Sequence, residues 1–304
     1  MEAFKRPELS DRPWVEALLA EEGSRACEHN FASICLWGNS YPQTIARAGD
    51  RLVVQMFGGR GLSYLFPMGK GPLAPALELA EEGARAGRAP ITFICLTAEQ
   101  RDALEEACPG RFVFEEDRDG WDYLYRVDKL AELTGKKLHS KRNHIHRFCE
   151  RYPDWMFEPI TGQNVAECMA MEEEWFRAQE EEGRVDCTLR REREAVHMAL
   201  ENMEALGMTG GLIRAEGKVL AFALGSLTTP DCYNVHFEKA FGEIQGAYTV
   251  INRETARWVR RSFPEVEYIN REDDLGLEGL RRAKLSYYPD LLLEKYVARE
   301  INQG

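Results

Sequence analysis

The sequence predicts a mixed α/β fold made of two successive units with a similar order of elements. Short apolar runs typical of strands alternate with segments whose apolar residues recur every three or four positions, as in helices. Hairpin signals at Ala48-Gly49-Asp50 and Ala215-Glu216-Gly217 stand at matching places in the two halves. Each half runs helix, hairpin, strand, helix, strand, helix, strand. We therefore expect each half to form a mostly antiparallel mixed sheet flanked by helices.

The first half, residues 1–127, opens with a helix that begins near Ser10 and Pro13 and ends at Gly23. Thr97 is expected to cap a later helix, with Gln100 in its first turn. The apolar patterns predict helices at 14–22, 74–86 and 97–107, and strands at 44–47, 51–56, 62–66, 91–96, 112–114 and 121–127.

Residues 128–153 are expected to form a helical linker, which Asp128 caps, Gly135 interrupts and Pro153 ends. The second half, residues 154–304, carries the candidate site. Its patterns predict helices at 164–181, 190–206, 246–262 and 277–284, and strands at 155–160, 209–214, 218–227, 233–237, 266–269 and 291–296.

Composition restricts the possible functions. The net charge is −12, from 39 basic and 51 acidic residues. We therefore do not expect the overall charge of the protein to favour binding to nucleic acid. The eight cysteines form no C-x-x-C pair and several lie in apolar runs, which is typical of a reducing compartment. We find neither a signal peptide nor a long apolar run, and expect a cytoplasmic protein without an integral membrane segment.

The segment that follows the strand at 266–269 is the first candidate site. It combines an amide, guanidinium groups, carboxylates and an ammonium group, which suits a polar substrate carrying both charge signs. A surface loop with weak ion pairs explains the same residues equally well. The residues singled out here are Asn270, Arg271, Glu272, Asp274, Arg281 and Lys284.

A second candidate is the junction at which a strand runs through a loop into the helix that begins at Gly246. Helix N-termini attract anions, and Lys239 adds a cation, so Gly246, Ala247 and Tyr248 are candidates for binding a phosphate. Ordinary helix capping by glycine is the simpler explanation.

A third candidate is a basic helix in the linker. Lys136, Lys141, Arg142 and Arg147 predict an RNA or phosphate contact, although a brace between domains explains them equally well. The histidines of this segment lack the spacing of a metal site, and we predict no bound metal. No G-x-S-x-G motif is present, so direct transfer between two bound substrates is favoured over a covalent intermediate.

Several segments together resemble the soluble proteins grouped with the C-terminal catalytic domain of phosphatidylglycerol lysyltransferase. They are residues 31–37, 135–137, 141–143, 238–240, 246–248, 270–276 and 279–287. The resemblance implies two tandem GNAT-like acyltransferase domains, as in the Fem-type aminoacyl transferases. It also implies transfer of an aminoacyl group from a charged tRNA to a small-molecule, lipid-headgroup or peptide acceptor.

The resemblance also implies roles for the candidate residues. Glu272 and Asp274 would hold or deprotonate an amino group, Arg281 and Lys284 would steady an oxyanion, and Lys239 with 246–248 would hold donor phosphates. We therefore expect an aminoacyl or acyl transferase that needs no cofactor. The alternatives are an N-acyltransferase with acyl-coenzyme A as donor, and a non-catalytic protein that binds a small zwitterion.

Overall fold

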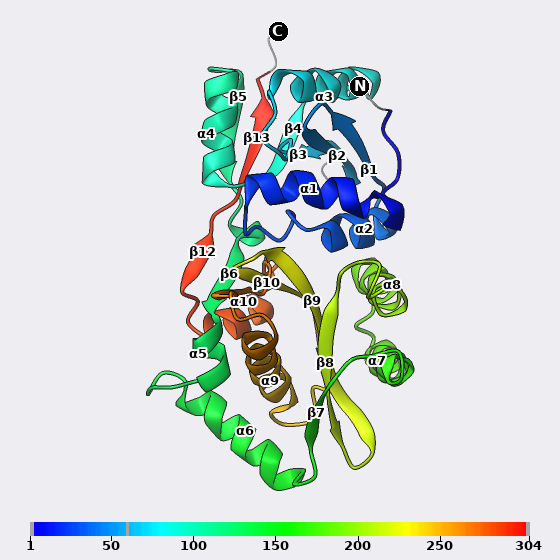
Figure 1. The fold of residues 1–304 in the computed structure, drawn as a ribbon, viewed down its shortest axis with the longest axis vertical. Helices are drawn as coiled ribbons and strands as arrows, with labels where there is room; N and C mark the ends of the chain where they lie inside the picture. Colours follow the sequence, from blue (N-terminus) through cyan, green and yellow to red (C-terminus); the bar gives the residue numbers. More distant parts are fainter. Residues whose placement is uncertain (1–2, 59–60, 302–304) are drawn as a thin grey trace. The chain divides into compact units, whose positions relative to one another are not determined.

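The computed structural model describes residues 3–58 and 61–301, which form two compact units. The first unit comprises Met1–Tyr123, Glu272–Lys284 and Leu291–Gly304, and the second comprises Leu124–Arg271 and Leu285–Asp290. Each unit contains a mixed sheet flanked by helices (Figure 1), so the predicted fold class is confirmed. Every helix within the described residues is too short or too polar to cross a lipid bilayer.

The sheet of the first unit has the strand order β1-β2-β3-β4-β13-β5. Strands β1, β2 and β3 form an antiparallel meander, β3 and β4 run parallel, and β13 lies antiparallel between β4 and β5. The bounds are β1 Gln43–Ala48, β2 Arg51–Gly58, β3 Gly61–Leu65, β4 Thr92–Leu96, β5 Phe112–Glu116 and β13 Tyr296–Glu300.

Helices α1 (Arg12–Glu22), α2 (Phe31–Ser40), α3 (Ala74–Ala86) and α4 (Ala98–Ala107) pack on this sheet. Residues of α3 and α4, together with the strands, form a core that includes Tyr64 and Phe93. Helix α10 spans Glu278–Leu285. The predicted cap of α4 is confirmed: Thr97 Oγ1 accepts from the Gln100 N–H, and Gln100 Oε1 accepts from the Thr97 N–H. Helix α2 was not predicted, because its residues are apolar almost throughout and show no helical periodicity.

The end of the chain differs from the prediction. The strand expected at 291–296 is two strands, β12 (Leu291–Leu293) and β13, and β13 belongs to the sheet of the first unit. The compact units thus differ from the division into 1–127, 128–153 and 154–304, since 128–153 lies in the second unit and much of 272–304 in the first. Pairing between strands nearly two hundred residues apart leaves no local signal in the sequence.

The second sheet has the strand order β12-β6-β11-β10-β9-β8-β7, with β12 at its edge beside β6. Strand β10 runs parallel to β11 and antiparallel to β9, and β6 begins in the first unit and continues into the second. The bounds are β6 Asp122–Arg126, β7 Met156–Pro159, β8 Thr209–Ala215, β9 Lys218–Thr229, β10 Cys232–Ala240 and β11 Tyr268–Asn270.

Helices cover both faces of this second sheet (Figure 1). The helices are α5 Val127–Glu132, α6 His139–Arg151, α7 Val165–Glu181, α8 Cys187–Glu201 and α9 Ala247–Ser262. Successive residues of β10 contact opposite sides: Lys239 pairs with Glu192 of α8, and Glu238 accepts from Asn252 of α9. The polar residues at the C-terminal end of β10 therefore contact helices on both faces of the sheet.

A β-bulge interrupts β10. Val235 pairs with Gly225 and Phe237 with Leu224, so His236 is an additional residue between two consecutive positions of β9. The bulge reverses which side chains face each side of the sheet beyond it. Residues an odd number apart normally lie on opposite faces, yet Tyr233 packs against Trp258 of α9 and Glu238, five residues later, also contacts α9.

Candidate functional site

The chain passes from the second unit to the first after β11, so the loop residues from Glu272 onward belong to the first unit. Glu272 and Leu275 adopt left-handed backbone conformations, with φ of 57° and 52°. Such values are uncommon outside glycine, so this loop has an unusually constrained backbone. The N–H of Tyr123 donates to the Glu272 carbonyl oxygen at 3.2 Å, and the Glu272 side chain remains half-buried.

Asp274 is fully buried and its carboxylate is surrounded by donors. Arg281 Nε and Nη2 donate to Oδ2 and Oδ1, each at 2.8 Å, while the Tyr123 hydroxyl donates at 2.5 Å and the Gly276 N–H at 3.0 Å. Burial raises the pKa of this carboxyl, but these hydrogen bonds outweigh burial and lower it to about 2. Arg281 also binds Asp119 at 2.6 Å. The Asp274–Arg281 pair therefore anchors the loop to α10.

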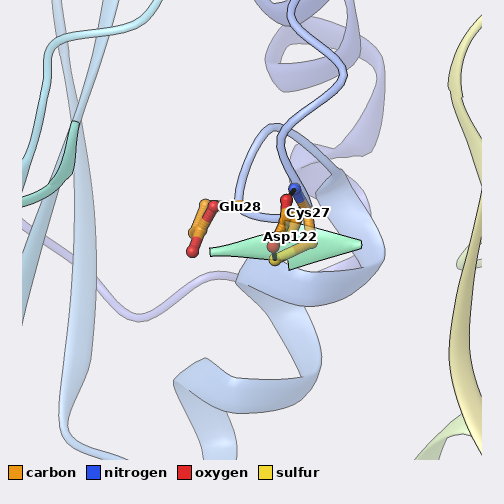
Figure 2. A group of neighbouring side chains, drawn as sticks. All are labelled: Cys27, Glu28 and Asp122. Atoms are coloured by element: carbon orange, nitrogen blue, oxygen red, sulfur yellow. Dashed lines mark hydrogen bonds between the residues drawn. The ribbon is translucent and has the colours of Figure 1, made fainter. Parts of the chain in front are cut away.

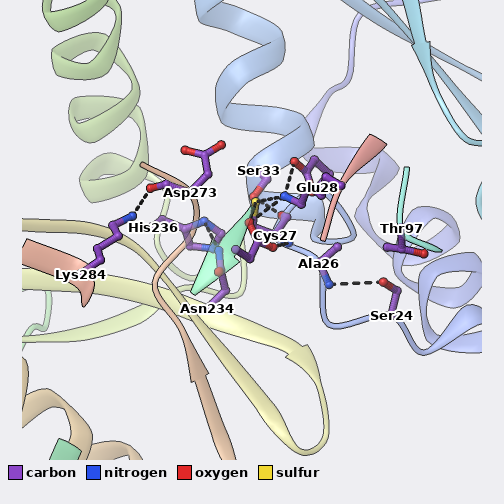
Figure 3. Close-up of polar contacts among 12 residues, drawn as sticks. Ser24, Ala26, Cys27, Glu28, Ser33, Thr97, Asn234, His236, Asp273 and Lys284 are labelled. Carbon is purple, nitrogen blue, oxygen red and sulfur yellow. Dashed lines mark hydrogen bonds and ion pairs between the residues drawn. The ribbon is translucent and has the colours of Figure 1, made fainter. Parts of the chain in front are cut away.

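Asp273 is in the opposite situation. Its side chain is half-buried, and burial raises the pKa of its carboxyl to about 7, against the opposing effect of Lys295 and with further contributions from the nearby Asp122 and Glu28. The Asp273 carbonyl oxygen accepts from Lys284 Nζ (Figure 3). Asp273 is thus the carboxyl of this loop that can exchange a proton near neutral pH.

A buried charged cluster lies near Asp273 in the first unit (Figure 2). Ligand atoms of Cys27, Glu28 and Asp122 lie within 4.8 Å of one another, close enough to hold a metal ion. Lys295 Nζ lies 2.7 Å from both Glu28 Oε1 and Asp122 Oδ1, and 3.4 Å from Cys27 Sγ. The ammonium group stands where a metal cation would bind. Burial, and then Asp122, raise the pKa of Cys27 well above its usual value, which disfavours the thiolate that a metal prefers.

In the second unit the predicted substrate-binding residues at the end of β11 are largely enclosed. Asn270 is buried in the strand. Arg271 binds Glu238 at 3.0 Å and stacks over the ring of Tyr287 at 5.1 Å, and Glu238 also accepts from Asn252 at 3.1 Å. The guanidinium of Arg271 is therefore fixed by an ion pair and an aromatic ring and does not lie in a solvated loop.

The basic helix α6 divides its cations between two roles. Lys141 stacks over the Tyr287 ring at 4.0 Å, where burial, and then Arg271, lower its pKa to about 8. Arg142 donates to the carbonyl oxygens of Leu133 and Gly135 and so closes the turn that precedes α6. Lys136, just before α6, and Arg147 within it are exposed, as the postulated RNA contact requires.

The residues predicted to bind donor phosphates are also in the second unit. Lys239 is buried, 2.9 Å from Glu192 and 3.9 Å from the centre of the Trp175 ring. Gly246 precedes α9 with a φ of 90°, and a Cβ there would collide with the His144 carbonyl oxygen. Close packing against α6 thus explains this glycine. Ala247 is buried in α9, and Tyr248 is exposed.

Sequence reasoning did not single out a hydrogen-bonded group on β9 and β10. His236 Nε2 lies 2.8 Å from Ser226 Oγ, and His236 Nδ1 lies 3.0 Å from Asn234 Nδ2. Asn234 and His236 stand two apart among the apolar residues Tyr233, Val235 and Phe237, which was the available signal. Asp273 was also not selected, although it stands among the acids of the first candidate loop, and Lys295 was not selected because it stands in no distinctive motif.

Comparison with known proteins identifies the family. The family model described as phosphatidylglycerol lysyltransferase, C-terminal, matches residues 19–299 and so reaches into both units. No curated protein is similar to the chain. Among solved structures, a conserved protein of unknown function from Bacteroides thetaiotaomicron is 39% identical, with a TM-score of 0.91, and the match covers 99% of this chain and 100% of that one.

More distant structures share the fold. L-PGS from Bacillus licheniformis is 17% identical with a TM-score of 0.67, and the match covers 100% of this chain and 95% of that one. A tandem GNAT protein from the clavulanic acid biosynthesis pathway is 11% identical with a TM-score of 0.50, covering 99% of each chain. The predicted tandem GNAT-like architecture is confirmed, and the chain belongs to the phosphatidylglycerol lysyltransferase C-terminal family.

Proposed function

We propose that the protein transfers an aminoacyl group from aminoacyl-tRNA to an amine or hydroxyl acceptor by direct attack on the activated ester. The observation that carries this proposal is the match of a lysyltransferase family over residues 19–299, which spans nearly the whole chain. Two substrates held together gain most of their rate from orientation, so the reaction requires no protein nucleophile.

The loop after β11 supplies the carboxylates for this reaction. We assign Glu272 and Asp273 to the amino group of the substrate, as ligands of its ammonium form or acceptors of its proton. Asp273 suits either role, because its pKa of about 7 lets it exist in both protonation states near neutral pH. Asp274 and Arg281 bind each other and hold the loop in place. Lys284, which already contacts the loop backbone, remains the cation proposed for the oxyanion.

The second unit supplies the contacts proposed for the donor. The exposed Lys136 and Arg147 are suited to RNA phosphates. The N-terminus of α9, with Tyr248 exposed beside it, is the proposed binding place for a donor phosphate, and the buried Lys239 contributes positive charge on the strand before it. The acceptor is a small molecule, a lipid headgroup or a peptide that presents a nucleophilic amine or hydroxyl.

The test is transfer from radiolabelled lysyl-tRNA to phosphatidylglycerol vesicles and, in parallel, to a dipeptide. We expect Glu272→Gln and Asp273→Asn to lose about a hundredfold or more of the rate, the usual contribution of a group that accepts a proton. Glu278→Gln is the matched control, because this carboxylate is on α10 with a side chain 82% exposed. It should retain the wild-type rate.

Two results would overturn the proposal. One is a wild-type protein that transfers no lysyl group to either acceptor. The other is transfer from acetyl-coenzyme A with none from lysyl-tRNA, which would make the protein a coenzyme A-dependent N-acyltransferase. Stabilisation by a free amino acid without turnover from either donor would indicate the non-catalytic, zwitterion-binding alternative.

A further inference from the structure

The bulge of β10 gives His236 an unusual position in the sheet. Val235 and Phe237 pair with consecutive residues of β9, so His236 stands between them without a pairing position of its own. Bulges of this kind redirect a side chain and are frequent next to active sites. The imidazole is half-buried, whereas Phe237 beside it is buried.

The opposing strand is shaped to accept this bulge. Gly225 pairs with Val235, and a Cβ on Gly225 would collide with the carbonyl oxygen of Asn234 and the ring of Tyr233. Any other residue at position 225 would therefore push β9 and β10 apart at the bulge. The neighbouring Ser226, which pairs with Asn234, brings its hydroxyl to the imidazole.

The ring of His236 is held at both nitrogens. Asn234 Nδ2 lies 3.0 Å from Nδ1 (Figure 3). Ser226 Oγ lies 2.8 Å from Nε2, and both partner residues are buried. With its amide nitrogen toward the ring, Asn234 donates to Nδ1 and the ring proton is on Nε2. A half-turn of the amide presents its oxygen instead, moves the ring proton to Nδ1, and lets Nε2 accept from the Ser226 hydroxyl. The arrangement thus matches a hydroxyl, a base and an orienting amide.

We propose that His236 is the acid–base residue of acyl transfer and that the Ser226 hydroxyl relays the proton between His236 and the acceptor. This inference rests on the proposed function. The acceptor nitrogen or oxygen bonds to the acyl carbonyl carbon and gives its proton to Ser226 Oγ, while the Ser226 proton moves to His236 Nε2. The bond from that carbon to the donor's ester oxygen breaks, and the imidazolium returns a proton, through Ser226, to this oxygen.

This assignment gives the proton transfer to a histidine. Imidazole is the side chain that most often exchanges protons at neutral pH, and a positioned base typically contributes about a hundredfold to ten-thousandfold in rate. Asn234 is then a positioning residue, because it acts through the ring.

A glutamine distinguishes catalysis from structure at this position. Its amide can still bridge Ser226 and Asn234, but it cannot carry the proton. We expect His236→Gln to lower kcat for lysyl transfer from lysyl-tRNA about a hundredfold or more, while KM and the melting temperature stay near wild type. Adding free imidazole to His236→Ala should restore part of the rate, a recovery that a merely structural role would not show. The matched control is His146→Gln on α6, where the side chain is 73% exposed and the rate should not change.

The partners give a second set of variants. Ser226→Ala should lower kcat by removing the relay, and Ser226→Thr should restore much of it because the hydroxyl returns. A His236→Gln enzyme within about threefold of wild type would overturn this inference alone. So would a loss of rate in His236→Ala that imidazole does not relieve. A wild-type protein without any transfer activity would instead overturn the proposed function, and this inference with it.

Discussion

Lys295 and Asp122 form an ion pair in which neither side chain is exposed to solvent: Nζ and Oδ1 lie 2.7 Å apart, and both exposed fractions are 0%. Burial alone would lower the pKa of Lys295, but the surrounding charges, Asp122 foremost, raise it well above its usual value. β13, which carries the chain on from Lys295, and β6, which begins at Asp122, are far apart in sequence. The pair therefore ties the C-terminal segment to the rest of the first unit.

Removing the cation should be costly. In Lys295→Met the carboxylates of Asp122 and Glu28 stay in the interior without their counter-charge, so we expect the free energy of unfolding to fall by about 3–5 kcal/mol. Urea denaturation followed by circular dichroism measures this change. Adding Asp122→Asn to Lys295→Met should recover part of the loss, and Lys70→Met, at an exposed lysine of the same unit, should cost little. A Lys295→Met protein as stable as wild type would show that the pair contributes no stability.

The pH dependence of stability should reveal Asp273. The carboxyl has a pKa of 3.8 in the unfolded chain and about 7 in the folded protein, so between these values the folded state binds more protons. Its contribution to stability is fully present below pH 3.8 and is lost as the pH rises through about 7. Asp273→Asn should therefore be more stable than wild type at pH 8, with the difference vanishing toward pH 4. Unfolding free energies at several pH values measure it.

The pKa of Asp274 is shifted in the opposite direction from that of Asp273, so its effect on stability has the opposite pH dependence. Its pKa is lowered from 3.8 to about 2 in the folded protein, so its stabilising effect is present above pH 3.8 and is lost as the pH falls through about 2. Asp274→Asn should thus be less stable than wild type at neutral pH. If Asp273→Asn and Asp274→Asn shifted stability at pH 8 in the same direction, the opposite environments described for these neighbours would be incorrect.

The sequence predicted elements whose signals are local. The capping box at Thr97 and the long helix after Gly246 were both found, since each depends on residues within a few positions of one another. The return of β13 to the first sheet depends on partners near residues 93 and 114, and no nearby residue encodes that choice. The order of elements was therefore more predictable than their assignment to units.

The candidate site shows the same limit. The carboxylates of the loop were recognised by residue type, but an anchoring acid such as Asp274 and a proton-exchanging acid such as Asp273 have the same side chain. Their difference arises from their surroundings: Arg281, Tyr123 and the Gly276 N–H donate to Asp274, whereas burial is the largest influence on Asp273. The role of His236 depends on strand register, because the bulge exists only once β9 and β10 are paired.

Gly246 should be intolerant of any side chain. Its φ of 90° strains an L-residue, and a Cβ would overlap the His144 carbonyl oxygen of α6, so Gly246→Ala should lower the free energy of unfolding by at least about 1–3 kcal/mol. Gly242→Ala, in the same loop, is the matched control: a Cβ there meets open space, and stability should be nearly unchanged. Thermal unfolding of the two variants compares them directly. Equal melting temperatures would mean that α6 and α9 adjust freely to the added methyl group.

The final prediction concerns the exposed cations of the basic helix region. If Lys136 and Arg147 contact RNA phosphates, Lys136→Glu with Arg147→Glu should weaken tRNA binding and reduce the slope of log affinity against log salt concentration by roughly two. Fluorescence anisotropy with labelled tRNA at several salt concentrations measures both quantities. The fold should be unaffected, because both side chains are exposed.

Arg142 distinguishes an RNA contact from a general effect of positive charge. Its guanidinium donates to the carbonyl oxygens of Leu133 and Gly135, so Arg142→Ala should lower stability while leaving the salt slope near that of wild type. Unchanged tRNA affinity and salt slope in the Lys136→Glu, Arg147→Glu protein would remove the RNA role from this region. Since the chain carries a net charge of −12, any tRNA contact must then come from another local group of cations.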